Sequence, residues 1–478
     1  MASVFIGRKE ELQIFQQLLN KRSASLVIVK GRRRIGKSRL IKEFAKDFQF
    51  YTFSGLPPTA GITAQSQRDE FSRQLGENLG MPGIKMQDWG DLFTLLAKQV
   101  QKNRVIILFD EISWMGSSDP TFLGKLKNAW DMKLSQNPKL ILILCGSVSS
   151  WIEKNIINST GFLGRPSMYL TLDELPLVDC NQFWKKKGRG VSAYEKLKIL
   201  SVTGGIPRYL ELIDPKHSAE ENIKQLCFVK YGALVNEFEH IFTDIFLNRT
   251  ELYKNIIEQL AMGDADQETL AARVGLARSG MLSEYLNDLV LCGFISRNFT
   301  WHINTGKISK LSSYRLCDNY LRFYLKYILP NKAKIEKGIF TARTLTALPG
   351  WDTIMGLQFE NLVLNNHRGI TKILGIHPED IVFHNPFFQR GTNRQLGCQI
   401  DFLIQTRFHS VYVCEIKFSR HKIGVDIIKE VEEKIARLKL PRHFSYRPVL
   451  IHVNGVHEDV IDSGYFSELI DFSQLLEE

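Results

Sequence analysis

Two patterns of apolar and polar residues alternate along the first 150 residues. Short apolar runs, typical of buried strands, occur at 26–29, 105–109 and 140–145, and residues 48–53 alternate as a half-buried strand does. Apolar residues recur at helical spacing at 12–19, 39–45, 66–80 and 88–101. Strands that alternate with helices predict an α/β fold built on a parallel sheet.

A glycine-rich segment separates the first strand from the helix that follows it. Its sequence, Gly-Arg-Arg-Arg-Ile-Gly-Lys-Ser at 31–38, fits the P-loop pattern G-x-x-x-x-G-K-[ST]. Gly31 and Gly36 let backbone N–H groups turn toward phosphate oxygens, and the new helix presents its positive end to them. Lys37 would reach the β- and γ-phosphates, and Ser38 would hold Mg²⁺. We therefore expect an ATP site, which would also include Arg34, Ile35 and Arg39.

Two acids end the apolar run at 105–109, which is the Walker B pattern. Asp110 would hold Mg²⁺ through water, and Glu111 would polarise the water that attacks the γ-phosphate. Ser147 follows the next strand, at the sheet edge where ligands of open α/β sheets bind. It would sense the γ-phosphate or the attacking water, or it is an ordinary serine at a strand end.

Residues 174–248 are mostly helical in pattern and fit a lid. Gly204-Gly205 breaks one helix, and Pro207 suits the first turn of the next, from which Arg208 would face the nucleotide. Arg165, after Leu163-Gly164, is either an arginine finger that stabilises charge in the transition state or a solvated loop arginine.

These motifs occur in an order that is characteristic of a known family. They are Phe-Ile-Gly-Arg-Lys-Glu-Glu-Leu, the P-loop, Leu-Phe-Asp-Glu, Leu-Cys-Gly-Ser, Leu-Gly-Arg and Gly-Gly-Ile-Pro-Arg-Tyr-Leu. The series resembles the archaeal-type AAA ATPases, relatives of the STAND and origin-recognition ATPases. The resemblance implies an ATPase core with strand order 5-1-4-3-2, a helical lid, a winged helix and a nuclease-like C-terminal domain. It also implies that Arg165 contacts phosphate and that Gly205 and Pro207 pack beside the adenine.

The segment from 249 to 330 has the pattern of a winged helix-turn-helix. Three amphipathic helices at 251–261, 268–274 and 279–291 precede a strand that starts at 294 and a wing that runs to 316. No acid lies between Asp288 and Asp318, whereas the wing carries Arg297, Lys307, Lys310 and Arg315. A basic wing suits phosphate contact, but the same module serves equally as a protein-docking or relay element.

Residues 331–347 are expected to be a linker, and 348–478 to be a nuclease-like domain. Asp401 and the Glu415-Ile416-Lys417 segment have the spacing of the PD-(D/E)xK core, with Ile400 in place of the proline. Period 2 puts Glu415 and Lys417 on one face of a strand, and a hairpin brings Asp401 beside them. Both carboxylates and the Ile416 carbonyl would hold Mg²⁺ or Mn²⁺, and Lys417 would activate water. Glu360, on a preceding helix, would bind a second metal or brace the first. The alternative for the Glu415-x-Lys417 strand is an ordinary solvated sheet face.

Composition and net charge exclude few classes of protein. The 478-residue chain is 44% hydrophobic and has a net charge of +11, yet residues 331–478 hold 18 basic and 18 acidic side chains, so basicity is weak evidence for DNA binding. Seven scattered cysteines without C-x-x-C spacing indicate a reduced, cytoplasmic protein, and no apolar run predicts a membrane span. His377, His384 and His421 lack ligand spacing and are expected to be loop or surface residues.

The sequence as a whole predicts an ATP-switched nuclease that cuts DNA or RNA. Catalytic roles fall to Glu111 and Arg165 in the ATPase and to Asp401, Glu415 and Lys417 in the nuclease. The first alternative is a nucleotide-gated switch that binds DNA or protein and keeps a silent nuclease fold; a DNA-remodelling motor is the second. Nucleic acid, a second copy of the chain or another protein would be the partner.

Overall fold

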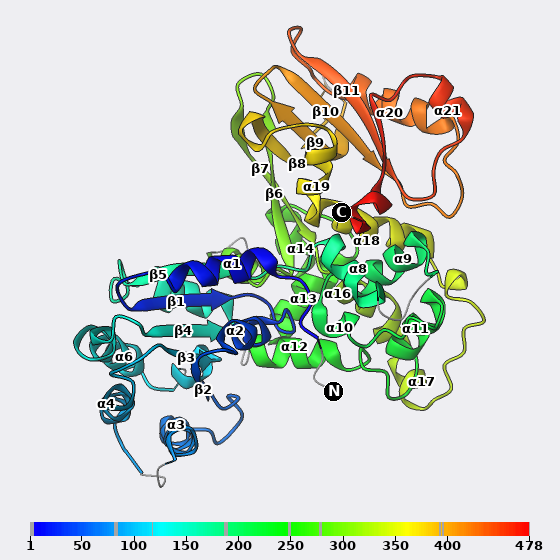
Figure 1. The fold of residues 1–478 in the computed structure, drawn as a ribbon. Coiled ribbons are helices and arrows are strands. Elements are labelled where there is room, and N and C mark those ends of the chain that lie inside the picture. Colours follow the sequence, from blue (N-terminus) through cyan, green and yellow to red (C-terminus); the bar gives the residue numbers. More distant parts are fainter. Residues whose placement is uncertain are drawn as a thin grey trace. The chain divides into compact units, whose positions relative to one another are not determined.

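The computed structural model describes residues 4–80, 85–116, 118–185, 190–246, 250–276, 280–391, 393 and 396–477 (Figure 1). The chain divides into two compact units. The first consists of Met1–Asp173, Glu239–Thr250 and Asn287–Gly293, and the second of Glu174–Phe238, Glu251–Leu286 and Phe294–Glu478.

The first unit is built on a five-stranded parallel sheet. Its strands are β1 (Ser25–Lys30), β2 (Gln49–Ser54), β3 (Val105–Asp110), β4 (Ile141–Gly146) and β5 (Pro166–Thr171), in the order β2-β3-β4-β1-β5. This confirms the predicted order 5-1-4-3-2, which is the same order counted from the other edge. The expected apolar and alternating runs form the four strands β1–β4, and β1 is an interior strand between β4 and β5 with both faces buried.

Helices cover both faces of this sheet (Figure 1). On one side lie α1 (Lys9–Leu18) and α2 (Lys37–Ala45), whose Phe15 and Phe44 rings are 4.9 Å apart. On the other side lie α3 (Ala64–Leu79), α4 (Trp89–Gln99) and α6 (Phe122–Met132), which share one core with alternate residues of the strands. The short helices α5 (Ile112–Gly116) and α7 (Ser149–Ile152) follow β3 and β4 directly. The functional strand ends are therefore anchored in a large apolar core.

Eight helices and a hairpin follow in chain order. The helices are α8 (Leu177–Lys185), α9 (Ala193–Thr203), α10 (Pro207–Leu210), α11 (Ala219–Cys227), α12 (Glu237–Phe246), α13 (Thr250–Ala261), α14 (Gln267–Arg273) and α15 (Gly280–Leu291). Strands β6 (Ile295–His302) and β7 (Lys307–Leu316) then pair as an antiparallel hairpin, and Ala265 forms a bridge to Tyr314. The expected boundary at 248/249 and the expected helix start at Ser279 lie outside the described residues. The domain limits after residue 173 stay predictions.

The stretch expected to be a linker contains ordered structure. After α16 (Asn319–Phe323) and two further turns, α17 (Lys332–Glu336) and a short 3₁₀ turn (Leu345–Ala347) lie within 331–347. Ile335 and Leu345 are fully buried. These two apolar residues are too far apart in sequence to form a helical pattern. They become buried only when the unit folds.

A second five-stranded sheet forms the C-terminal part of the second unit. Its strands are β8 (Ile381–Gln389), β9 (Cys398–Thr406), β10 (Ser410–Ile416), β11 (Ser445–His452) and β12 (Glu468–Asp471), in the order β12-β11-β10-β9-β8. The pairs β8–β9 and β9–β10 are antiparallel, whereas β10–β11 and β11–β12 are parallel. Apolar residues of α18 (Trp351–Asn365) and α19 (His367–Ile373) cover one face, and those of α20 (Asp426–Arg437) cover the other.

A buried set of polar side chains joins β7 and α16 to α18. Asn361 accepts from Nη1 of Arg315 at 2.5 Å and donates to Oδ1 of Asn319 at 2.9 Å. Gln358 donates to the Asn319 carbonyl at 2.6 Å, and Asn319 returns a bond to the Gln358 carbonyl at 3.1 Å. Because these side chains are at most 8% exposed, the bonds replace those that water would make.

Candidate functional site

The phosphate loop lies between β1 and α2. Gly31 has φ +149°, and a Cβ placed on it would come within 2.5 Å of the Leu172 carbonyl oxygen, so only glycine fits there. Arg34 (φ 70°) and Gly36 (φ 93°) also have positive φ, and Gly36 is the N-cap of α2. The loop thus turns tightly at the positive end of a nine-residue helix, an arrangement that suits phosphate.

Lys37 lies inside this loop. Its side chain is 6% exposed, and Nζ donates to the carbonyl oxygens of Gly31 at 2.9 Å and Arg32 at 3.0 Å. A phosphate that enters the loop would offer this ammonium group stronger, charged acceptors than the two carbonyls.

Ser38 and Asp110 meet at the carboxyl ends of the strands. The Ser38 hydroxyl, on the first turn of α2, donates to Oδ2 of Asp110 at 2.7 Å. Hydroxyl and carboxylate oxygens are the ligands that Mg²⁺ prefers, so this pair fits the ion that accompanies ATP. The structure thereby brings together two residues that lie 72 positions apart.

Glu111 is held by Ser147. Glu111 follows β3 with φ 52°, and Ser147 follows the neighbouring strand β4. The backbone N–H and the hydroxyl of Ser147 donate to the same Glu111 oxygen, Oε2, at 3.0 and 2.9 Å. Ser147 is fully buried, so it fixes the orientation of the carboxylate that was predicted to activate water.

Arg8 belongs to the same site and was missed from the sequence. It is 6% exposed and has φ 60°, and Nη2 donates to the carbonyls of Ile35, inside the phosphate loop, at 3.2 Å and of Asp173 at 2.5 Å. Nη1 donates to Glu11 at 2.8 Å. The signal available in the sequence was the Gly7-Arg8 turn before α1. In the structure, the buried Arg8 braces the phosphate loop because it donates to a backbone carbonyl within that loop.

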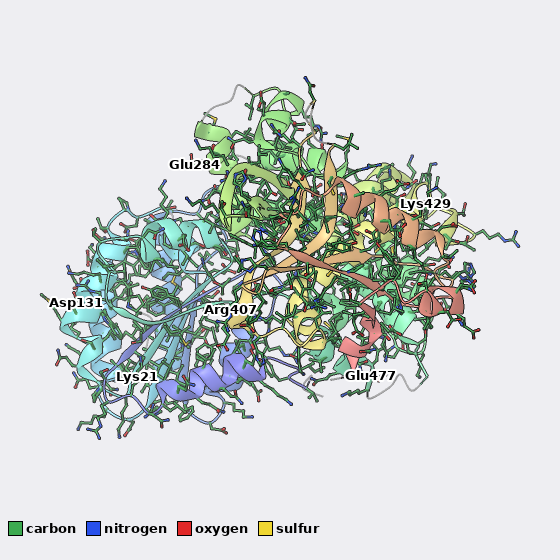
Figure 2. The ribbon with its side chains drawn as sticks, turned by 90° about the horizontal axis from the view of Figure 1, so that it is seen from above. Lys21, Asp131, Glu284, Arg407, Lys429 and Glu477 are labelled. Atoms are coloured by element: carbon green, nitrogen blue, oxygen red, sulfur yellow. The ribbon has the colours of Figure 1, made fainter. Side chains whose placement is uncertain are left out.

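Four further residues were predicted for the nucleotide site. Arg165 forms a two-pronged pair with Asp131 on α6, with both N···O distances at 2.8 Å. These bonds lower the pKa of Asp131, which is labelled in Figure 2, to about 2. Arg39 donates to the Val4 carbonyl at 2.8 Å. Pro207 begins α10 of the second unit, as expected for its fixed φ, and the exposed Arg208 beside it pairs with Glu211.

Asp401 and Glu415 come together in the C-terminal sheet. They sit on the antiparallel neighbours β9 and β10, and Oδ2 of Asp401 accepts from the Ile416 N–H at 3.0 Å. Glu415 is 3% exposed and Asp401 14%. Burial, followed by the charge of Glu415, raises the pKa of Asp401.

Two lysines neutralise these acids. Nζ of Lys417 lies 3.1 Å from Glu415 and 2.8 Å from Glu430. Nζ of Lys434 lies 2.5 Å from Oε2 of Glu415 and 3.6 Å from Oδ1 of Asp401. Lys434 was not predicted. It lies four residues after Glu430, the other partner of Lys417, so both side chains project from one face of α20. This spacing of four residues is the signal available in the sequence.

Glu360 lies on α18, where the charge of Asp401 acts on its carboxyl group. Burial is the main cause of its raised pKa, and the charge of Asp401 raises it further, whereas Arg315 and Arg322 oppose the shift. Within the described part of the chain, no group of three or more His, Cys, Asp or Glu side chains has the geometry of a metal site. The predicted ligands Glu360, Asp401 and Glu415 are therefore not preassembled around a cation.

Two general expectations can be compared with the structure. All seven cysteines are free, and six are buried, which matches packing residues. None of the helices among the described residues has the length and apolar character needed to span a bilayer.

Comparison with known proteins identifies the first part of the chain. The model of a family described as an ATPase domain predominantly from Archaea matches residues 5–213. The uncharacterized protein MJECL04 of Methanocaldococcus jannaschii is 26% identical over 366 residues, which are 75% of this chain and 76% of that protein.

Two solved structures are also similar. The Walker-type ATPase PABY2304 of Pyrococcus abyssi has a TM-score of 0.49 at 17% identity and covers 67% of this chain and 96% of its own. The ORC2 protein of Aeropyrum pernix has a TM-score of 0.41 at 14% identity, covering 68% and 93%. From the family match and the phosphate loop described above, residues 5–213 are an ATPase domain of the predominantly archaeal type.

Proposed function

We propose that this chain is an ATP-dependent switch that controls a metal-dependent nuclease site acting on DNA or RNA. The ATPase half follows from the family of residues 5–213. One observation carries the nuclease half: Asp401 and Glu415 lie side by side on neighbouring strands, and Lys417 contacts Glu415. That is the set of groups that metal-assisted phosphodiester cleavage needs.

In the ATPase domain, each residue has a separate task. Lys37 would transfer its hydrogen bonds from the loop carbonyls to the β- and γ-phosphates, and Ser38 with Asp110 would hold Mg²⁺. Glu111 would accept a proton from the attacking water, in the orientation that Ser147 fixes. Arg165 would report the γ-phosphate only after leaving Asp131, a proposal that requires their ion pair to open.

In the nuclease site, Asp401, Glu415 and the Ile416 carbonyl would hold Mg²⁺ or Mn²⁺, with Glu360 as a brace. The bound metal would supply the positive charge that stabilises the attacking and departing oxygens. Lys417 would orient the water. Lys434 would neutralise the buried Glu415 before the metal binds. The lysine would then compete with the metal, because both cations would bind the Glu415 carboxylate.

The proposed link between the two activities is the segment from α13 to β7, in the role of a winged helix. Its hairpin packs on the C-terminal sheet: Trp301 donates to Gln405 at 2.6 Å and Thr300 to the Phe388 carbonyl at 2.8 Å. Through Arg315, the hairpin also holds Asn361, the residue after Glu360. These contacts favour a relay role for the hairpin over free insertion into DNA.

A specific observation favours the alternative, a nucleotide-gated binding switch with a silent nuclease fold. The acids are already neutralised by Lys417 and Lys434, and the described residues contain no ready cluster of three metal ligands. In that case the C-terminal domain would dock nucleic acid or a protein, or pair with a second copy.

The test is a cleavage assay on mixed DNA and RNA with Mg²⁺ or Mn²⁺, with and without ATP. We expect cutting by the wild type that Asp401→Asn abolishes and Lys37→Ala alters. Asn keeps the size of the side chain and removes its charge. ATP hydrolysis that persists in Asp401→Asn shows that its first unit is folded, and an unchanged urea midpoint for the second unit shows that the C-terminal sheet is intact. Intact ATP hydrolysis with no cutting under any condition would reject the nuclease and leave the binding switch.

A further inference from the structure

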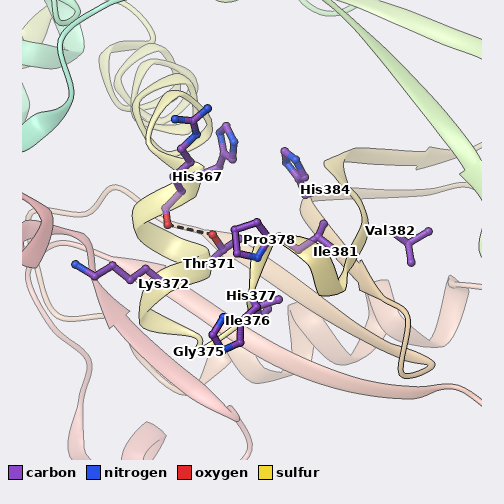
Figure 3. A pocket seen from close by; sticks show the side chains of 11 residues that line it. His367, Thr371, Lys372, Gly375, Ile376, His377, Pro378, Ile381, Val382 and His384 are labelled. Carbon is purple, nitrogen blue, oxygen red and sulfur yellow. Dashed lines mark hydrogen bonds between the residues drawn. The ribbon is translucent and has the colours of Figure 1, made fainter. Parts of the chain in front are cut away.

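A surface hollow of about 800 Å³ opens between α19 and the start of β8, in the C-terminal part of the second unit (Figure 3). Its volume lies within the range of about 300–1,000 Å³ that is usual for small-molecule sites. Cationic or imidazole side chains supply most of its polar lining: His367, Arg368, Lys372, His377 and His384.

The chemistry of the lining favours an anion. None of the described residues that line the hollow is acidic. Asp380, which is close in sequence, is engaged by Arg407 at 2.7 Å and is not part of the wall. Arg368 and Lys372 carry fixed positive charge, and both are exposed on α19. An anionic ligand would therefore meet several cationic or imidazole side chains on the described wall of the hollow.

The rest of the lining suits a flat apolar group. The rings of His367 and His384 lie nearly parallel, 22° apart in plane and 4.6 Å between centroids, so they stack on each other and together form one part of the wall (Figure 3). Ile376, Pro378 and Ile381 complete an aliphatic wall. Imidazole rings and aliphatic surface are partners on which a nucleobase can pack.

We propose that this hollow binds a nucleoside phosphate, with the cationic side chains of α19 toward its phosphate and the aliphatic wall toward its base. The ligand is a free mononucleotide or the phosphorylated end of a nucleic-acid strand, since both present the same chemistry. The hollow shares no lining residue with the phosphate loop or with the Asp401–Glu415 acids, so the proposal stands without nuclease activity.

Calorimetric titration of the full chain in EDTA tests this, with thymidine 5′-monophosphate, thymidine, and a thymidine trinucleotide with and without its 5′-phosphate. EDTA removes the metal that cutting would need. We expect each phosphorylated probe that binds to do so at least tenfold more tightly than its unphosphorylated counterpart. Binding by the mononucleotide alone would identify a free nucleotide, and tighter binding by the trinucleotide would identify a strand end.

Variants assign the binding to the hollow. The double change Arg368→Ala, Lys372→Ala should weaken binding at least tenfold, and His384→Gln should weaken it less. Lys429→Ala, which removes one positive charge from an exposed position on α20, should leave binding unchanged (Figure 2). Binding should also survive Lys37→Ala. The proposal is overturned if no phosphorylated probe binds, or if binding is lost with Lys37→Ala and kept in the double variant.

Discussion

Replacing Gly31 with alanine is expected to destabilise the first unit by about 2–4 kcal/mol. The new Cβ would lie 2.5 Å from the Leu172 carbonyl oxygen, and because real contacts of this kind stay beyond 3.0 Å, the two backbones must separate by about 0.5 Å. A residue at φ +149° also carries strain of about 1–3 kcal/mol when it is not glycine. The neighbouring bond, from the Leu172 N–H to the Lys30 carbonyl at 2.8 Å, would weaken by about 1 kcal/mol.

Urea unfolding and amide hydrogen exchange measure this effect. The Leu172 amide should exchange faster in Gly31→Ala, and nucleotide affinity should fall because the Gly31 carbonyl is one of the acceptors of Lys37. Gly164→Ala is the matched control: Gly164 also has positive φ (+73°), but no atom lies within 4 Å of its added Cβ. It should cost only about 1 kcal/mol. Equal destabilisation by the two substitutions would refute the argument from close approach.

Other substitutions test the remaining contacts. Glu111→Gln should lower kcat for ATP hydrolysis at least ~100-fold with nucleotide affinity nearly unchanged, as phosphate release and equilibrium binding would show. Because Arg165 lowers the pKa of Asp131 from 3.8 to about 2, this carboxylate stabilises the fold fully above about pH 4, and the contribution disappears as pH falls to about 2. The stability difference between wild type and Asp131→Asn, measured by urea unfolding, should therefore shrink over that range. Lys434→Met should destabilise the second unit by about 1–3 kcal/mol, because the buried Glu415 loses a cation at 2.5 Å.

Each of these has an outcome that would contradict it. A Glu111→Gln enzyme whose only defect is in nucleotide affinity would remove Glu111 from the chemistry. A stability difference for Asp131→Asn that does not vary with pH would mean that its bond to Arg165 opens in solution. Lys429→Met, on the same helix but exposed, is the control for Lys434→Met, and equal effects would mean that helix propensity explains both.

Local signals predicted the ATPase core. Four of its strands are continuous or alternating apolar runs, and the phosphate loop and the Asp110-Glu111 pair are contiguous motifs that the fold leaves intact at strand ends. The fifth strand, Pro166–Thr171, is partly exposed at the edge of the sheet and carries no strong pattern, so only the family resemblance supplied it.

The pattern of apolar and polar residues could not predict contacts between side chains that are distant in sequence. The bond between Glu111 and Ser147 depends on β3 and β4 being neighbours, and Arg8 finds its carbonyl partners at Ile35 and Asp173, distant in sequence. Lys434 reaches Glu415 only because α20 folds back over the sheet. In each case, the sequence shows a residue that can form the bond, but the tertiary packing decides which partner it meets. The spacing of residues along the chain does not give that partner.

The buried bonds among Arg315, Asn319, Gln358 and Asn361 limit how this chain could be recombined. A chimera joined within 331–347 would take two of these side chains from each parent. Unless both parents carried the same four residues, the junction would bury amide and guanidinium groups without acceptors, at about 1–3 kcal/mol each. The segment from β7 onward is therefore expected to be exchanged between relatives as one piece, together with the C-terminal sheet.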